Sequence, residues 1–150
     1  ERGYQVLLPW GSALEKTQAE QLSGDYAHCT VLPRLSLGEL AGLLVESAGA
    51  VCVDTGLAHV AAALDVPTVT LYGATDPHLI GATGASVCHL RATGFDCYNQ
   101  RCDTADYSGE QAQCMTTIST QAVWHALERL QAKEPLIASD IALAEGHSKG

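Results

Sequence analysis

The residues best suited to chemistry are Asp54, Thr55, Gly56 and His59, which follow the apolar run 50–53 and open a stretch of small, helix-forming residues. The N-terminus of a helix presents unpaired backbone N–H groups and the positive end of the helix dipole, and both attract anions. Thr55 adds a hydroxyl donor, and Gly56 lets a phosphate approach the backbone closely. We therefore predict a diphosphate-binding turn.

Two residues of this turn have a second interpretation. Asp54 would repel a phosphate, so it would either bind sugar hydroxyls or only cap the helix. His59 lies four residues after Thr55, which places it one helical turn further on and lets it donate to a phosphate or a sugar. Alternatively, it packs as an ordinary histidine in an alanine-rich helix. The spacing leaves both questions open.

Two loops nearer the N-terminus could complete a nucleotide site. Glu15 follows the loop after the first expected strand, where a carboxylate could accept hydrogen bonds from ribose hydroxyls. Ser12 and Glu15 also have the spacing of a capping box, as do Ser36 and Glu39, and the first box explains Glu15 without any ligand. Leu35 lies in the loop after the second expected strand, where an apolar side chain could pack on a base. A simple connecting loop is the alternative for Leu35.

The elements that must position these residues alternate along the chain. Apolar and β-branched runs predict strands, and segments with capping signals and helical spacing predict helices. The expected strands span 4–8, 29–32, 50–53, 68–71 and 86–90, and the expected helices, with their caps, span 12–23, 36–46, 57–64 and 119–133. This order predicts an α/β fold with an open, mostly parallel, doubly wound, Rossmann-like sheet, whose ligands bind at the carboxyl ends of the strands.

The bulk composition narrows the class of partner. The chain has 150 residues, 47% of them hydrophobic and 17% charged, which is typical of a globular domain. Its net charge of −9 argues against a nucleic-acid partner, because phosphates repel an acidic surface. We therefore expect a globular domain without a nucleic-acid partner.

The six cysteines fall into two groups. Three lie in or beside strand-like runs and are interpreted as buried free thiols: Cys29, Cys52 and Cys88. Three lie in or just after the long loop over 91–113: Cys97, Cys102 and Cys114. Their spacing does not match a CxxC pair, so we expect no metal site and assign them no role. This usage of cysteine favours a reducing cytosol.

Four motifs follow one another along the chain in this order: LLPWG, LPRLS, VDTGLAH and YGATDP. Together they resemble the bacterial ADP-heptose:lipopolysaccharide heptosyltransferases, with the strongest likeness to the members that add the first heptose of the inner core. The resemblance covers most of residues 6–84. It implies the C-terminal, donor-binding half of a two-domain GT-B glycosyltransferase. Such an enzyme transfers heptose, with inversion, from ADP-heptose to a Kdo sugar of lipid A and requires no cofactor.

The resemblance also assigns roles to single residues. It implies that Thr55 and Gly56 hold the diphosphate, and that Asp54 and His59 lie near the phosphates or the heptose. Two further positions match the parts of the family site that hold the nucleoside: Glu15 for the ribose and Leu35 for the adenine.

Parts of the family pattern are not found in this sequence. They are the N-terminal domain, which holds the acceptor site and the aspartate expected as general base, and the first strand and helix of the second domain. We therefore expect residues 1–134 to form a donor-binding domain without its first strand and helix, and 135–150 to form a tail. The catalytic residues stay unassigned, and we expect no transfer activity from this chain by itself. The expected location is the cytosolic face of the inner membrane, and the oligomeric state is left open.

Three other hypotheses remain at this point. The chain could belong to another GT-B enzyme, or to a sugar-nucleotide epimerase, that uses a different nucleotide. It could be a non-catalytic nucleotide-binding module. The cysteine-bearing loop could instead mark a metal-binding module.

Overall fold

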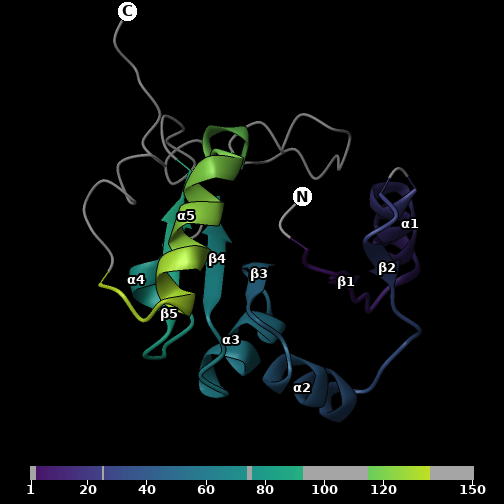
Figure 1. Cartoon of the computed structure of the whole chain (residues 1–150), viewed down its shortest axis with the longest axis horizontal. Helices are drawn as coiled ribbons and strands as arrows, with labels where there is room; N and C mark the ends of the chain where they lie inside the picture. The colour runs from purple at the N-terminus through teal and green to yellow at the C-terminus, as the bar shows by residue number, and fades with distance from the viewer. Residues whose placement is uncertain (1–2, 25, 74–75, 93–114, 136–150) are drawn as a thin grey trace, which may run out of the picture. The chain divides into compact units, whose positions relative to one another are not determined.

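The computed structural model describes residues 3–24, 26–73, 76–92 and 115–135 (Figure 1). Strands and helices alternate along these residues, and every strand pairing is parallel. The predicted parallel α/β class is therefore confirmed. The chain divides into two compact units, Glu1–Leu43 and Leu44–Gly150, which are described separately below as unit 1 and unit 2. The expected donor-binding domain over 1–134 and tail over 135–150 stay a prediction.

Unit 1 contains a single strand–helix–strand motif. Its elements are β1 (Val6–Leu8), α1 (Ala13–Ser23) and β2 (Cys29–Val31). The two strands pair in parallel, with Val6 opposite Cys29 and Leu8 opposite Val31. Both strands are shorter than predicted, and the buried apolar side chain of the motif is Ala19. This small sheet serves mainly to place the two loops that follow its strands.

Both predicted capping boxes are confirmed. At the start of α1, the Glu15 N–H donates to Ser12 Oγ at 3.3 Å, and the Ser12 N–H donates to Glu15 Oε2 at 2.8 Å. Ser36 and Glu39 repeat this exchange at the start of α2 (Leu37–Val45), with distances of 3.3 and 2.7 Å. Each box satisfies backbone donors that the first helical turn leaves without partners.

Unit 2 contains a three-stranded parallel sheet in the order β3-β4-β5. Its elements are β3 (Ala50–Val53), α3 (Gly56–Ala63), β4 (Thr68–Tyr72), α4 (Pro77–Ile80), β5 (Val87–Arg91) and α5 (Thr120–Gln131). The central strand β4 is the most buried of the three, with Val69 and Tyr72 at 0% exposure. β3 is an edge strand, because β4 is its only paired neighbour among the described residues.

Helices cover both faces of this sheet. On one face α5 packs along β4 and β5, as Figure 1 shows, and its core members are Val69, Cys88, Leu90, Ala122, Ala126, Leu127 and Leu130. On the other face α3 packs through a smaller cluster of Ala58, Ala62 and Ala82, with Cys52 and Val87 against it. Because side chains alternate along β5, Cys88 and Leu90 meet α5, and His89 lies on the α3 side. The doubly wound arrangement is thus present within unit 2.

The cysteine interpretation is confirmed in part. Cys29, Cys52 and Cys88 are free thiols, but only Cys88 is fully buried, and the other two are partly exposed. Burial raises the pKa of the Cys52 thiol, which keeps it protonated and unreactive near neutral pH. The other three cysteines lie outside the described residues. Among the helices that the structure describes, none is long and apolar enough to cross a membrane.

Candidate functional site

The turn between β3 and α3 has the open backbone that the sequence predicts. Thr55 is the N-cap residue of α3, with an extended backbone at φ −141° and ψ 160°. Its carbonyl accepts the Ala58 N–H at 3.1 Å, but its hydroxyl makes no capping hydrogen bond. The first N–H groups of a helix have no acceptor within the helix. The Thr55 hydroxyl and the N–H groups of Gly56 and Leu57, the first two residues of α3, therefore form a set of donors that the helix leaves open.

Two structural interpretations of this turn are wrong, namely Asp54 as a helix cap and His59 as a packed core residue. Asp54 is not the helix cap, because α3 begins at Gly56 and the cap position falls on Thr55. No hydrogen bond or ion pair joins the exposed Asp54 side chain to another described residue. His59 is exposed rather than packed in a core. Both side chains are therefore available to a ligand.

The alanines of α3 set the direction of its polar residues. Ala58, Ala61 and Ala62 are 1%, 0% and 4% exposed and form the face of α3 that meets its neighbours. His59 follows Ala58 by about 100° around the helix, so it lies off this buried face, and it is exposed. At Gly56, a Cβ atom would have no neighbour within 4 Å, so the backbone there borders open space. A ligand oxygen could approach this backbone closely.

A second turn lies at the same edge of the unit 2 sheet. β3 and β4 are parallel neighbours, with Val53 opposite Leu71, so the segments that follow them leave the sheet at the same end. Asp76 caps α4 by accepting the His78 N–H at 2.9 Å, and Pro77 takes the first helical position. Thr75 lies outside the described residues.

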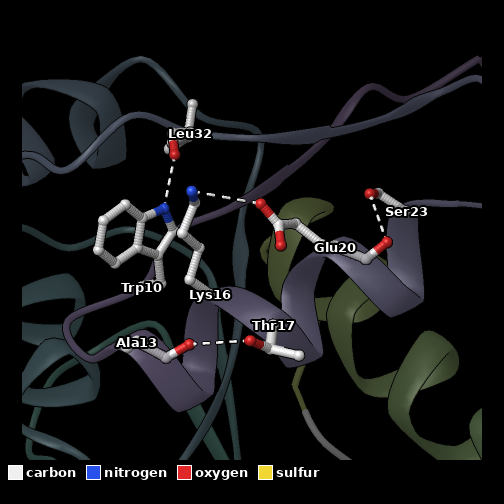
Figure 2. A network of polar contacts seen from close by, with 7 residues as sticks. All are labelled: Trp10, Ala13, Lys16, Thr17, Glu20, Ser23 and Leu32. Atoms are coloured by element: carbon white, nitrogen blue, oxygen red, sulfur yellow. Dashed lines mark hydrogen bonds and ion pairs between the residues drawn. The ribbon is translucent and has the colours of Figure 1, made fainter.

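Unit 1 brings its two predicted loops together. The indole N–H of Trp10, after β1, donates to the Leu32 carbonyl, after β2, at 2.7 Å (Figure 2). Lys16 Nζ lies 5.6 Å from the centroid of the Trp10 ring and 3.3 Å from Glu20 Oε1. The loop that leads to Glu15 is thus tied to the loop that leads to Leu35.

Glu15 accepts hydrogen bonds from two backbone N–H groups in the structure. Its Oε2 atom accepts the N–H groups of Gly11 and Ser12 at 2.7 and 2.8 Å. These two donors, followed by the Ser12 hydroxyl, lower the pKa of Glu15, which is exposed and ionised at neutral pH. The capping interpretation is confirmed, and the ribose role stays a prediction. Leu35 is partly exposed, and its adenine role also stays a prediction.

The sequence motifs assign no role to a polar network that joins β4, β5 and the segment after α4. His89 Nδ1 lies 2.6 Å from Thr70 Oγ1, and its ring meets the Tyr72 ring edge-on with centroids 5.4 Å apart. The Tyr72 hydroxyl accepts the Ala82 N–H at 3.2 Å. Burial is the main cause that lowers the pKa of His89. The register of β4 against β5 brings these residues together, and no sequence motif encodes that register.

A metal site finds no support in the part of the chain that the structure describes. No three His, Cys, Asp or Glu side chains there are grouped to hold a metal ion. Cys97, Cys102 and Cys114, on which the metal-module hypothesis depends, lie outside those residues.

A parallel α/β fold with open helix-terminal donors at the carboxyl edge of its sheet is the architecture of a nucleotide-binding domain. Residues 1–108 match the family model of glycosyltransferase family 9 (heptosyltransferase). The chain belongs to this family, which confirms the resemblance seen in its motifs.

Known relatives agree with this assignment. The chain is 42% identical, over 144 residues, to lipopolysaccharide heptosyltransferase 1 of Pseudomonas aeruginosa, a match that covers 87% of this chain and 40% of the relative. The solved structure of Escherichia coli heptosyltransferase WaaC with ADP matches at 44% identity and a TM-score of 0.61, over 63% of this chain and 29% of that chain. WaaC with ADP-2-deoxy-2-fluoro heptose matches at 40% identity and a TM-score of 0.58, over 63% and 28%. The chain thus spans two fifths or less of the length of these relatives.

Proposed function

We propose that the complete protein transfers heptose from ADP-heptose to a Kdo sugar of the lipid A inner core, and that this chain supplies the donor-binding part. The observation that carries the proposal is the exposed turn of Thr55 and Gly56. The Thr55 hydroxyl makes no capping hydrogen bond there, and the Gly56 backbone borders open space. Membership of the heptosyltransferase family supports it. So does the likeness to a heptosyltransferase solved with ADP and with an ADP-heptose analogue.

Each part of the donor has a proposed partner. The diphosphate lies against the first N–H groups of α3 and the Thr55 hydroxyl, where the helix dipole favours negative charge. His59 donates to a phosphate, and Asp54 accepts from heptose hydroxyls, since a carboxylate would repel the phosphates. In unit 1, Glu15 accepts from the ribose and Leu35 packs on the adenine.

The proposed reaction is an in-line displacement. A Kdo hydroxyl attacks C1 of the heptose, the bond from C1 to the diphosphate oxygen breaks, ADP leaves, and the configuration at C1 inverts. The proton of the attacking hydroxyl passes to a general base, a role that we assign to no residue of this chain. The donors at Thr55, Gly56 and His59 stabilise the charge that develops on the leaving ADP, an electrostatic contribution of the oxyanion-hole type. We place the reaction at the cytosolic face of the inner membrane, where both substrates meet.

The proposal is tested with the complete protein, ADP-heptose and Kdo-lipid A. Mass spectrometry should detect the acceptor with one heptose added, and a thermal-shift titration should show stabilisation by ADP in preference to UDP. Preference for UDP would indicate a GT-B enzyme or an epimerase with another donor. Binding of ADP without any transfer would indicate a non-catalytic nucleotide-binding module.

A further inference from the structure

The side chain of Tyr72 joins two parts of unit 2 that are ten residues apart in sequence. Tyr72 ends β4 and is 0% exposed, and its hydroxyl accepts the Ala82 N–H at 3.2 Å. Ala82 is 2% exposed, so this N–H has no access to water and depends on the tyrosine for a partner. The hydrogen bond therefore fixes the segment after α4 against the end of β4.

The same segment packs on the helix that carries the candidate site. Ala82 forms a buried cluster with Ala58 and Ala62 of α3. The contact is close, because a Cβ atom at Gly84 would lie 2.7 Å from the Ala62 carbonyl oxygen. Ala58 lies in the first turn of α3, and its N–H donates to the Thr55 carbonyl at 3.1 Å. A continuous series of contacts thus leads from the Tyr72 hydroxyl to the Thr55 turn.

The Tyr72 ring has little freedom to move. His89 meets it edge-on, with the ring planes at 74° and the centroids 5.4 Å apart. His89 is itself held by Thr70, whose Oγ1 lies 2.6 Å from Nδ1. Thr70 is 0% exposed, so this support comes from the interior of the sheet. A ring fixed in this way can hold its hydroxyl at a constant position.

We propose that Tyr72 is a positioning residue for nucleotide binding, which acts through Ala82 and Ala58 to hold the Thr55 turn in its binding geometry. This proposal rests on the proposed function, since it assumes that the turn binds the diphosphate of ADP. Tyr72 does not contact the ligand itself, because its side chain is 0% exposed.

The test compares two variants of the complete protein. Tyr72→Phe removes the hydroxyl and keeps the ring. Thr68→Val is the matched control, because Thr68 is also on β4 and also 0% exposed. This substitution removes one buried hydrogen bond, which the Thr68 hydroxyl donates to the Val66 carbonyl at 2.7 Å, at the opposite end of the strand. Calorimetric titration with ADP, steady-state kinetics and amide hydrogen exchange are measured for both variants.

We expect Tyr72→Phe to weaken ADP binding and raise KM for the donor by roughly 3- to 10-fold, a range typical of coupling through packed side chains, with kcat little changed. The Ala58 amide should exchange faster in Tyr72→Phe, and Thr68→Val should leave exchange at Ala58 and the ADP affinity unchanged. Equal losses of affinity in both variants, or unchanged exchange at Ala58, would overturn the positioning role. A wild-type protein that does not bind ADP would refute the proposed function, whereas the exchange result would still report on the contact between Tyr72 and α3.

Discussion

His89 Nδ1 lies 2.6 Å from Thr70 Oγ1, so a partly buried imidazole on β5 is held by a buried hydroxyl on β4. Burial is the largest of the effects that lower the pKa of His89, and the charges of His78 and His59 act in the same direction. A hydrogen bond with the Ala82 backbone opposes them. The folded protein therefore binds a proton at His89 less readily than the unfolded chain does.

This relationship predicts the sign of a pH effect on stability. The contribution of His89 is fully present above its ordinary pKa of 6.5 and is lost as the pH falls from there through the lowered pKa of the folded state. The melting temperature should therefore fall less between about pH 7.5 and pH 5.5 in His89→Gln than in the wild type. His125→Gln, at an exposed position on α5, is the control and should follow the wild type. Parallel curves for wild type and His89→Gln would contradict the prediction.

Gly56→Ala should weaken ADP binding without lowering the stability of the fold. A Cβ atom at Gly56 meets nothing within 4 Å, so alanine should leave stability unchanged or raise it by about 0.4–1 kcal/mol. The same methyl group would occupy the space through which the diphosphate reaches the backbone. We expect an unchanged or higher melting temperature and roughly tenfold weaker ADP binding by calorimetry, equivalent to about 1.4 kcal/mol. Gly38→Ala, with equally open surroundings in α2, should leave binding intact. Wild-type affinity in Gly56→Ala would place the diphosphate elsewhere.

Asp54→Asn should impair transfer in the complete protein. The carboxylate makes no bond to another described residue, so its loss should not change the melting temperature. If it binds heptose hydroxyls, kcat/KM for ADP-heptose should fall about 10- to 100-fold, the effect of one charged hydrogen bond. Asp65→Asn is the control, because the Asp65 carboxylate lies after α3, away from the site, and accepts a hydrogen bond from the Ser86 hydroxyl. Asparagine also tolerates the backbone of Asp65, whose φ is 56°. Unchanged kcat/KM in Asp54→Asn would remove Asp54 from the mechanism.

Glu15→Gln and Glu39→Gln form a matched pair, because both glutamates accept the N-cap N–H of a capping box. Hydrogen bonds lower the pKa of both carboxyl groups, mainly from the Gly11 backbone at Glu15 and from the Ser36 side chain at Glu39. Their charged form therefore stabilises the helices above the ordinary pKa of 4.5, and this effect is lost as the pH falls below it.

The two variants should lose similar stability at neutral pH, but only Glu15→Gln should weaken ADP binding, because only Glu15 is proposed to hold the ribose. Thermal melts and calorimetric titrations with ADP distinguish the two effects. Equal ADP affinity in both variants would leave Glu15 with its capping role alone.

Features that depend on neighbouring residues could be predicted from the sequence. β3 was predicted at 50–53 and spans Ala50–Val53, and both capping boxes form as expected. The Asp54 cap was one of two local hypotheses that the spacing left open, and it is wrong because α3 begins at Gly56, which puts Thr55 at the N-cap position. The open turn itself was predictable, because a strand, a Thr-Gly pair and a helix-forming run specify it locally.

Features that depend on register could not be predicted. Thr70 faces His89 only because β4 and β5 pair with a particular offset, and residues nineteen apart carry no mark of it. The bond between Tyr72 and Ala82 likewise depends on how the segment after α4 folds back over the sheet. The division of the chain near Leu43 depends on the tertiary packing of many residues, which no motif records.

The position of β3 at the end of the strand order has one more consequence. Its side chains Val51 and Val53 are 49% and 53% exposed, and its backbone has a paired neighbour within the described residues on one side only. A segment that docks alongside such a strand is recognised by amide and carbonyl groups, which every amino acid shares. Alanine scanning would therefore miss it, and backbone chemistry such as proline or N-methyl substitution would be needed to detect it.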